Sequence, residues 1–120
     1  MPVLATALLA VVLHPAAQPS PARARFEEGQ RRERAGDLAG AEAAYRETLR
    51  LAPRMAGAHD RLGFVLGQLG RTREALDEFR RAAEADPKLF DAQYHLGATL
   101  WWTGDPTSAV IALRKAVALD

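Results

Sequence analysis

The chain has 120 residues, of which 48% are apolar and 26% charged, and its 16 basic and 15 acidic residues leave a net charge of +1. This length allows one small domain, and the composition excludes a wholly disordered chain, a collagen and a multi-span membrane protein. The near-zero charge gives no general attraction to nucleic acid or anionic membranes, and the absence of cysteine excludes disulfides, thiolate metal sites and cysteine nucleophiles.

Residues 1–21 differ from the rest of the chain because they carry no charge. An eleven-residue apolar run over 3–13 is followed by prolines and small residues. At about 1.5 Å per residue, such a run spans only about half of a bilayer core, so a transmembrane span is not expected. The pattern predicts a bacterial signal peptide and export to the periplasm or the medium. The alternatives are a disordered or loosely docked apolar tail, or a wrongly chosen start codon, and the protein would then be cytoplasmic.

From residue 22 onward the sequence repeats with a period of 34 residues. Gly36, Gly70 and Gly104 stand 34 residues apart, and so do several other small or large apolar positions. The period divides this part of the chain into three units, 22–55, 56–89 and 90–120, of which the last is cut short. A regular period of this length is typical of repeat proteins, in which each unit stacks on its neighbours.

Each unit is predicted to form two antiparallel helices, so the fold class is all-α. The 25 alanines and 14 arginines favour helix. Gly70 suits the left-handed position that ends a helix, Pro87 stops the next one, and Asp105 followed by Pro106 is a strong helix start. The expected helices cover 22–35, 38–52, 55–69, 72–85, 89–103 and 106–119.

The repeat resembles the tetratricopeptide repeat (TPR) family. The second unit carries Leu62-Gly63, then Ala75 and Phe79, and ends at Pro87, as the family pattern requires. The resemblance implies an α-solenoid of three helix pairs that forms a right-handed superhelix, with the first helix of each pair lining the concave side. The small residues are expected where helices cross, with Gly63 facing Ala75 and Ala82.

The two ends of the repeat region depart from the pattern in opposite ways. In the first unit Glu28 and Arg32 replace leucines and, with Arg25, are predicted to form a charged, ion-paired stripe suited to a terminal repeat. The last helix, over 106–119, is apolar nearly all round, which favours a chain excerpted from a longer one, or a truncated gene, with further repeats beyond. The alternative is a short protein whose apolar end is covered by a partner or by the leader.

The sequence shows no recognisable catalytic, cofactor or metal site. Away from the leader only His59 and His95 could act as bases, and neither lies in a known motif, so both are expected at the surface or in the groove. No histidine pair or carboxylate–histidine cluster has metal-ligand spacing. The basic clusters are flanked by acids, so nucleic acid is not an expected partner. The chain is therefore predicted to be non-catalytic.

What remains is a binding surface, which the resemblance places on the concave side. The predicted function is recognition of a peptide or protein there, without enzymatic activity; the alternative is an accessory repeat region of a larger enzyme. At least one of the two tryptophans should be exposed on the side of Phe64, unless it packs against a fourth repeat. The terminal-carboxylate clamp of some family members is not reproduced at the matching positions. The predicted partner-binding residues are Phe26, Gln30, Arg34, Asp60, Phe64, Gln68, Asp91, Tyr94, Trp101 and Trp102.

Overall fold

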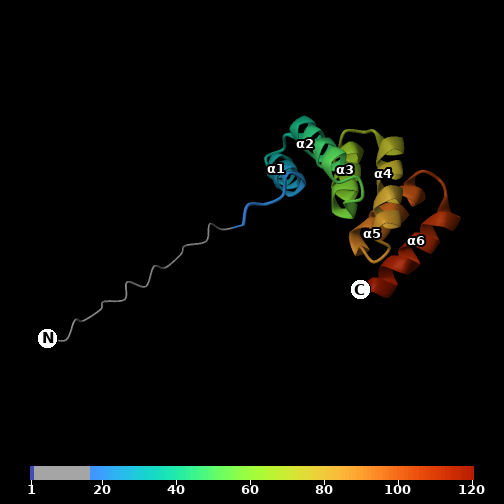
Figure 1. Ribbon diagram of the computed structural model, residues 1–120. Helices are drawn as coiled ribbons and strands as arrows, with labels where there is room; N and C mark the ends of the chain where they lie inside the picture. Colours follow the sequence, from blue (N-terminus) through green and yellow to red (C-terminus); the bar gives the residue numbers. More distant parts are fainter. Residues whose placement is uncertain (2–16) are drawn as a thin grey trace.

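The computed structural model describes Met1 and residues 17–120, and within this part of the chain it contains six α-helices and no strand (Figure 1). Each expected boundary lies within one residue of the observed one. The prediction of an all-α fold is therefore confirmed, while the interpretation of the leader falls outside the described residues. The helices are α1 Pro21–Arg34, α2 Leu38–Leu51, α3 Ala56–Gln68, α4 Thr72–Ala85, α5 Phe90–Trp102 and α6 Pro106–Leu119.

The helices pack as three consecutive pairs that stack in chain order. The most extensive contacts join α1 to α2, α3 to α4 and α5 to α6. The second helix of each pair then packs against the first helix of the next pair, and α3 also contacts α5 (Figure 1). Each pair therefore contacts mainly its neighbours, which is the architecture of a solenoid.

The turns inside the three pairs share one geometry. Gly36, Gly70 and Gly104 all have a φ between 79° and 86°, a left-handed conformation that glycine adopts without strain. Asp37 and Asp105 then cap α2 and α6, because their carboxylates accept hydrogen bonds from the backbone N–H groups three residues later.

The second unit departs from this capping pattern. Arg71 stands at the position equivalent to Asp37 and Asp105, and it has no side chain that could accept a backbone hydrogen bond. Its guanidinium instead contacts Glu74 in the first turn of α4, at 2.7 Å, and Glu42 on α2, at 2.8 Å. This position thus joins the first two pairs.

Close packing within each pair depends on a glycine in its first helix, but the partner differs from the expected one. A Cβ on Gly63 would lie 2.7 Å from the ring of Phe79, whereas the sequence predicted contacts with Ala75 and Ala82. The equivalent Gly29 and Gly97 face Tyr45 and Leu113 in the same way. The glycine therefore makes room for the large apolar residue of the second helix, because a flat ring reaches further across the pair than an alanine does.

A continuous apolar core runs through the first two pairs. It includes Phe26, Tyr45, Leu62, Leu66 and Phe79, all of which are buried. At the outer side of α1, Glu28 contacts Arg25 at 2.9 Å and Arg32 at 3.2 Å, which confirms the predicted charged stripe.

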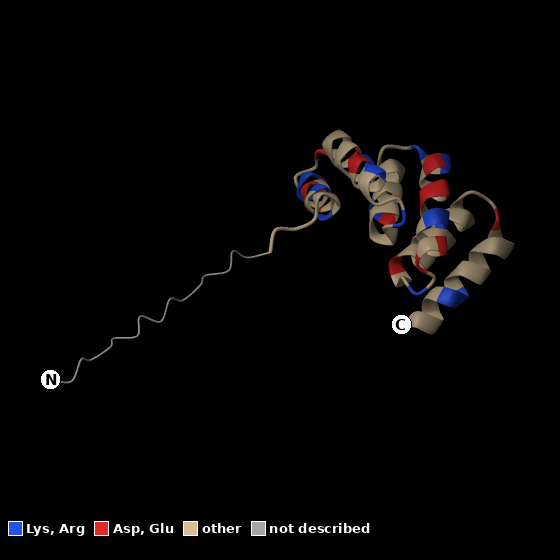
Figure 2. Cartoon of the chain, in the orientation of Figure 1, with Lys and Arg blue, Asp and Glu red and all other residues tan. Residues whose placement is uncertain are grey.

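The last helix leaves apolar side chains in solvent. Val110, Ile111, Val117 and Leu119 are all exposed, and Figure 2 shows that α6 carries few charged residues. No helix among the described residues has both the length and the apolar character that crossing a membrane requires.

Candidate functional site

Two adjoining hollows lie along the first helices of the three pairs. The first, of about 430 Å³, has mostly polar walls, and the second, of about 420 Å³, has mostly apolar walls. Phe64 and Gln68 on α3 line both, so the two hollows adjoin at these side chains, and together they are here called the groove. The polar part is lined by Gln30, Glu33, Arg34, Arg61 and Asp91, and the apolar part by Gly63, Gly67, Thr72, Ala75, Phe79, His95, Ala98, Thr99 and Trp102.

The order of side chains along the groove follows from the 34-residue period. Arg34, Gln68 and Trp102 occupy equivalent positions near the ends of α1, α3 and α5. Gln30, Phe64 and Ala98 form a second row of equivalent positions one helical turn earlier. Equivalent positions of stacked repeats lie side by side, so the groove changes from polar and charged at the first unit to apolar at the third.

A partly buried polar cluster forms the floor of the polar part. Glu33 on α1 accepts hydrogen bonds from Arg61 on α3 and from the Tyr45 hydroxyl on α2, the latter at 2.6 Å. Burial raises the pKa of Tyr45 to about 12, so this hydroxyl stays a proton donor at all physiological pH values. The cluster joins the first and second pairs directly beneath the groove.

Arg61 is the central member of this cluster. Its guanidinium also lies over the Phe64 ring, 4.5 Å from the ring centre, a favourable cation–π geometry. Burial lowers the pKa of Arg61, and the negative charge of Asp91 opposes that effect. Both carboxylates of the polar part, Glu33 and Asp91, thus act on Arg61. Arg34, in contrast, is exposed and has no carboxylate within ion-pair distance among the described residues.

His95 forms the floor of the apolar part. Its ring lies between the rings of Phe64, Phe79 and Tyr94, with centre-to-centre distances of 5.6, 5.2 and 5.8 Å. Its Nδ1 is 2.8 Å from the carboxylate of Asp60, whose side chain is only 3% exposed. This pair joins α3 to α5 as Arg61 and Glu33 join α1 to α3.

Six of the ten residues predicted from the sequence line the groove, and four do not. Phe26 and Asp60 are buried and belong to the core and to the His95 pair, so they are not available at the surface. Tyr94 is half exposed and stacks on Phe90, and Trp101 is 60% exposed, but both lie outside the two hollows. The six that line the groove are Gln30, Arg34, Phe64, Gln68, Asp91 and Trp102.

Trp102 is the most exposed large side chain in the groove. It is 86% exposed and lines the apolar part together with Phe64, as expected for one of the two indoles.

The sequence-based residue set omitted Arg61 and His95, which occupy equivalent positions 34 residues apart. That shared position on α3 and α5 is the signal that would have identified them.

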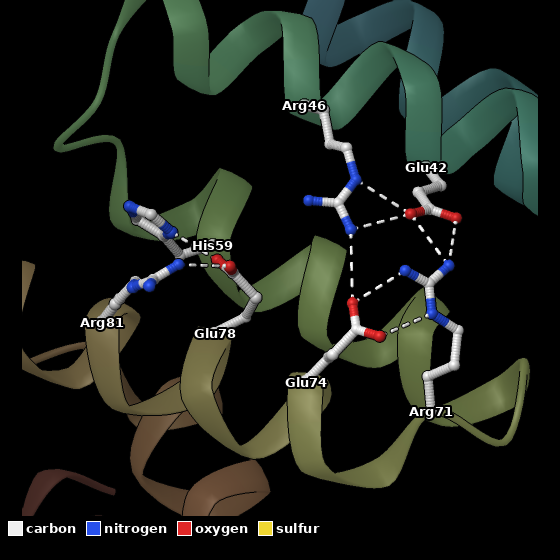
Figure 3. A network of polar contacts seen from close by, with 7 residues as sticks. All are labelled: Glu42, Arg46, His59, Arg71, Glu74, Glu78 and Arg81. Carbon is white, nitrogen blue, oxygen red and sulfur yellow. Dashed lines mark hydrogen bonds and ion pairs between the residues drawn. The ribbon is translucent and has the colours of Figure 1, made fainter.

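His59 is not at the surface, contrary to the expectation from the sequence. It is 8% exposed and lies between two hydrogen-bond acceptors, the carboxylate of Glu78 at 2.7 Å (Figure 3) and the carbonyl of Pro53 at 2.8 Å. Both ring nitrogens can donate only when the imidazole is protonated. Although burial opposes the charged form, the hydrogen bonds to Glu78 and Pro53 raise the pKa of His59. His59 is therefore a structural residue.

The His59–Glu78 pair should make folding stability depend on pH. A raised pKa of His59 means that its stabilisation is complete below its unfolded pKa of about 6.5 and is lost as the pH rises through the folded value. For Glu78, burial raises the pKa, but the hydrogen bond from His59 outweighs it and leaves the pKa lowered, so its contribution is lost only in acid. We expect the free energy of unfolding to fall as the pH rises above about 6.5.

The equivalent residue in the third unit supplies the control for this prediction. Gln93 donates to the carbonyl of Pro87 at 3.3 Å, as His59 does to Pro53. The variant His59→Gln keeps a donor for that carbonyl but carries no titratable charge. Urea denaturation at several pH values should show that the free energy of unfolding depends less on pH in His59→Gln than in the parent chain. Equal pH dependence in the two chains would contradict the assignment of this effect to His59.

A second ion-pair network joins α2 to α4 on the side shown in Figure 3. Glu42 contacts Arg46 and Arg71, both at 2.8 Å, while Glu74 contacts Arg71 at 2.7 Å and Arg46 at 3.6 Å. The four charges cancel, and every cation has two anionic neighbours. The network therefore links the first two pairs and leaves none of its four charges unpaired.

The fold and the groove together define a class: a helical repeat protein with a groove along its first helices. The sequence profile of the tetratricopeptide repeat family matches residues 3–56 and 61–120, and the chain belongs to that family. This fold is typical of protein–protein interaction modules, and such domains are generally non-catalytic scaffolds.

Two curated relatives are similar over most of the chain but are much longer. The chain is 40% identical over 90 residues to the cellulose synthase 2 operon protein C of Komagataeibacter xylinus, covering 72% of this chain and 7% of that protein. It is 30% identical over 93 residues to the small glutamine-rich tetratricopeptide repeat-containing protein 2 of Mycosarcoma maydis, covering 78% of this chain and 26% of the relative. The chain thus corresponds to a minor part of either protein.

Solved structures support the same fold. The TPR2B domain of yeast Sti1, in a structure described as its complex with a pHsp70, superposes with a TM-score of 0.78 at 25% identity. The match covers 82% of this chain and 79% of that one. MamA superposes with a TM-score of 0.77 at 21% identity and shows the fold alone, over 82% of this chain and 57% of its own.

Proposed function

We propose that the chain is a non-catalytic interaction module that binds an extended segment of a partner protein in its groove. The observation that carries this proposal is the exposed indole of Trp102, which stands over an apolar hollow floored by Phe64 and His95. A tryptophan left in solvent beside a hollow is the type of side chain that dominates binding energy at interfaces, because it buries a large area at little entropic cost.

The resemblance to the Sti1 domain supports a peptide-like occupant. That domain was solved in complex with a pHsp70, so a fold of this shape accommodates a protein ligand. The chemistry of the groove fits an extended segment: the amide groups of Gln30 and Gln68 can donate to and accept from a peptide backbone, and the apolar part offers a pocket for one side chain.

The neighbouring tryptophan makes a matched control for the experiment. We expect peptides selected from a displayed random library on the full chain to lose at least about 2 kcal/mol of binding in Trp102→Ala, the size of an interface hot spot. Trp101→Ala removes the same side chain from the same helix, outside the groove, and should leave binding unchanged. Clones that bind both variants as well as they bind the parent chain would exclude the groove as the site.

A second candidate function follows from the relative in a cellulose synthase operon. In that reading the repeats are an accessory part of a larger enzyme system, since the chain corresponds to 7% of that protein. Further repeats would then cover the apolar face of α6. The downstream reading frame distinguishes the two functions: a catalytic domain in the same chain would favour the second.

We also propose that the protein is exported, on the basis of the uncharged apolar leader over residues 1–21. Mass spectrometry of the mature N-terminus in the native host tests this. A new N-terminus near residue 18 or 23 is expected, and an intact Met1 on cytosolic protein would overturn the proposal.

A further inference from the structure

We propose that the segment bound in the groove carries two side chains in a set order: an acidic residue over the first unit and a bulky apolar residue over the third, about six residues apart. This inference rests on the proposed function and specifies the ligand of the same site. It follows from the charges, the apolar walls and the spacing of the helices that form the groove.

The acidic residue is assigned from the charges of the polar part. Four charged side chains line it, and three of them already interact with one another: Glu33 pairs with Arg61, and Asp91 lies close enough to act on the same guanidinium. Arg34 is the remaining one. It is exposed, lines the hollow, and has no ion-pair partner in the part of the chain that the structure describes. A carboxylate from the ligand would give Arg34 a bidentate partner.

The apolar residue is assigned from the opposite end of the groove. Trp102 occupies in the third unit the position that Arg34 occupies in the first, and Ala98 similarly replaces Gln30. The change from Gln30 to Ala98 removes a polar group and leaves space beside the indole. A leucine or phenylalanine side chain would fill this space against Phe64 and Trp102.

The distance between the two contacts follows from the stacking of the repeats. Arg34 and Trp102 are separated by two steps between first helices: α3 contacts α5 (Figure 1), and α1 is joined to α3 by the pair of Glu33 and Arg61. For each step we take about 10 Å, the upper spacing of packed helices. An extended chain advances about 3.3 Å per residue, so each step takes about three residues and the two steps about six. Between the two contacts, Gln68 lies where a backbone amide of the ligand would pass.

The test uses synthetic peptides that are acetylated and amidated, so that a side chain supplies the only carboxylate. One glutamate and one phenylalanine are placed about three, six or nine residues apart in an otherwise serine–threonine chain. Each peptide is also made with glutamine in place of glutamate. Isothermal titration calorimetry on the full chain gives the dissociation constants.

We expect the six-residue spacing to bind best, and its glutamate form to bind about tenfold more tightly than its glutamine form. That difference should disappear in Arg34→Gln and persist in Arg31→Gln, which removes an exposed arginine from the same last turn of α1 outside the groove. The advantage of glutamate should also shrink in high salt, because exposed ion pairs are screened.

Several results would overturn the inference while leaving the proposed function intact. One is binding that depends on Trp102 but is equally tight for the glutamate and glutamine peptides. The others are tightest binding at a spacing other than six residues, and an affinity for the glutamate peptide that is unchanged in Arg34→Gln. A peptide that binds only when its terminal carboxylate is free would also overturn the inference. So would the case in which library peptides bind in a Trp102-dependent way but no peptide of the synthetic series binds. If neither the series nor any library clone depends on Trp102, the proposed function fails as well.

Discussion

Replacing Gly63 with leucine is expected to destabilise the chain by an amount in the upper part of about 1–3 kcal/mol, which is the usual cost of overpacking a core. Even the first carbon of a side chain there would lie 2.7 Å from the ring of Phe79, closer than real Cβ contacts allow. Phe79 is 4% exposed and is held between helices, so its ring has little freedom to move aside. Thermal unfolding followed by circular dichroism measures the effect, at about 4–8 °C per kcal/mol for a domain of this size.

Two other variants make this prediction specific. Gly67 lies one turn further along α3, and a Cβ there would be 3.9 Å from Ala75, an ordinary contact. Gly67→Ala should therefore be neutral or stabilising, since alanine favours helix over glycine by up to about 1 kcal/mol. Arg73→Ala, on the exposed side of α4, should change stability by less than about 0.5 kcal/mol. Equal melting temperatures for Gly63→Leu and Arg73→Ala would contradict the assigned helix contact.

Replacing His95 with leucine is expected to destabilise the chain by about 1–3 kcal/mol, the typical cost of leaving a buried hydrogen-bond acceptor without its partner. The substitution leaves the carboxylate of Asp60 without its partner at a site where that side chain is 3% exposed. Leucine is close in volume to histidine and would fit among the surrounding rings. The loss should therefore come from the unpaired carboxylate and not from a cavity.

The double variant Asp60→Leu with His95→Leu separates these two causes. Replacing both members of a buried pair with apolar residues of similar size is often neutral, so the double variant should recover much of the stability lost in His95→Leu. Urea denaturation of the parent chain, both single variants and the double variant gives the coupling between the two residues. A double variant no more stable than His95→Leu would show that the packing of the rings, and not the hydrogen bond to Asp60, requires histidine.

Two polar pairs beneath the groove connect its floor to the stacking of the helix pairs. Arg61 with Glu33 and His95 with Asp60 each cross from one helix pair to the next, and each supports one side of Phe64. A groove whose floor is held in this way is already formed in the free chain, so the proposed ligand would need to spend little binding energy on ordering it. The two exposed residues proposed to contact that ligand, Arg34 and Trp102, can therefore vary among repeats without affecting the core.

Most of the fold could be predicted from local features of the sequence. The 34-residue period divides the chain into units, and short-range signals such as Gly70 and the Asp105-Pro106 start mark the helix ends. These signals act within a few residues, through a left-handed backbone conformation and capping hydrogen bonds, so they can be recognised in the sequence without knowledge of any tertiary contact. The family resemblance, transferred along the chain by the period, also placed six of the predicted residues at the groove, because equivalent positions face the same side in every repeat.

The contacts that join residues about 19–35 positions apart were decided only by the tertiary structure. They bury His59 against Glu78 and Asp60 against His95, and they bring Glu33 to Arg61. Helical periodicity identifies the face on which a residue lies, but not how far a side chain reaches or which neighbour it meets at a helix crossing. The same reason explains why Phe26 is in the core and why Gly63 faces the ring of Phe79. The sequence thus determined the repeat and, through the family resemblance, the side on which the groove lies, while the stacking of the pairs decided which side chains on that side remain exposed.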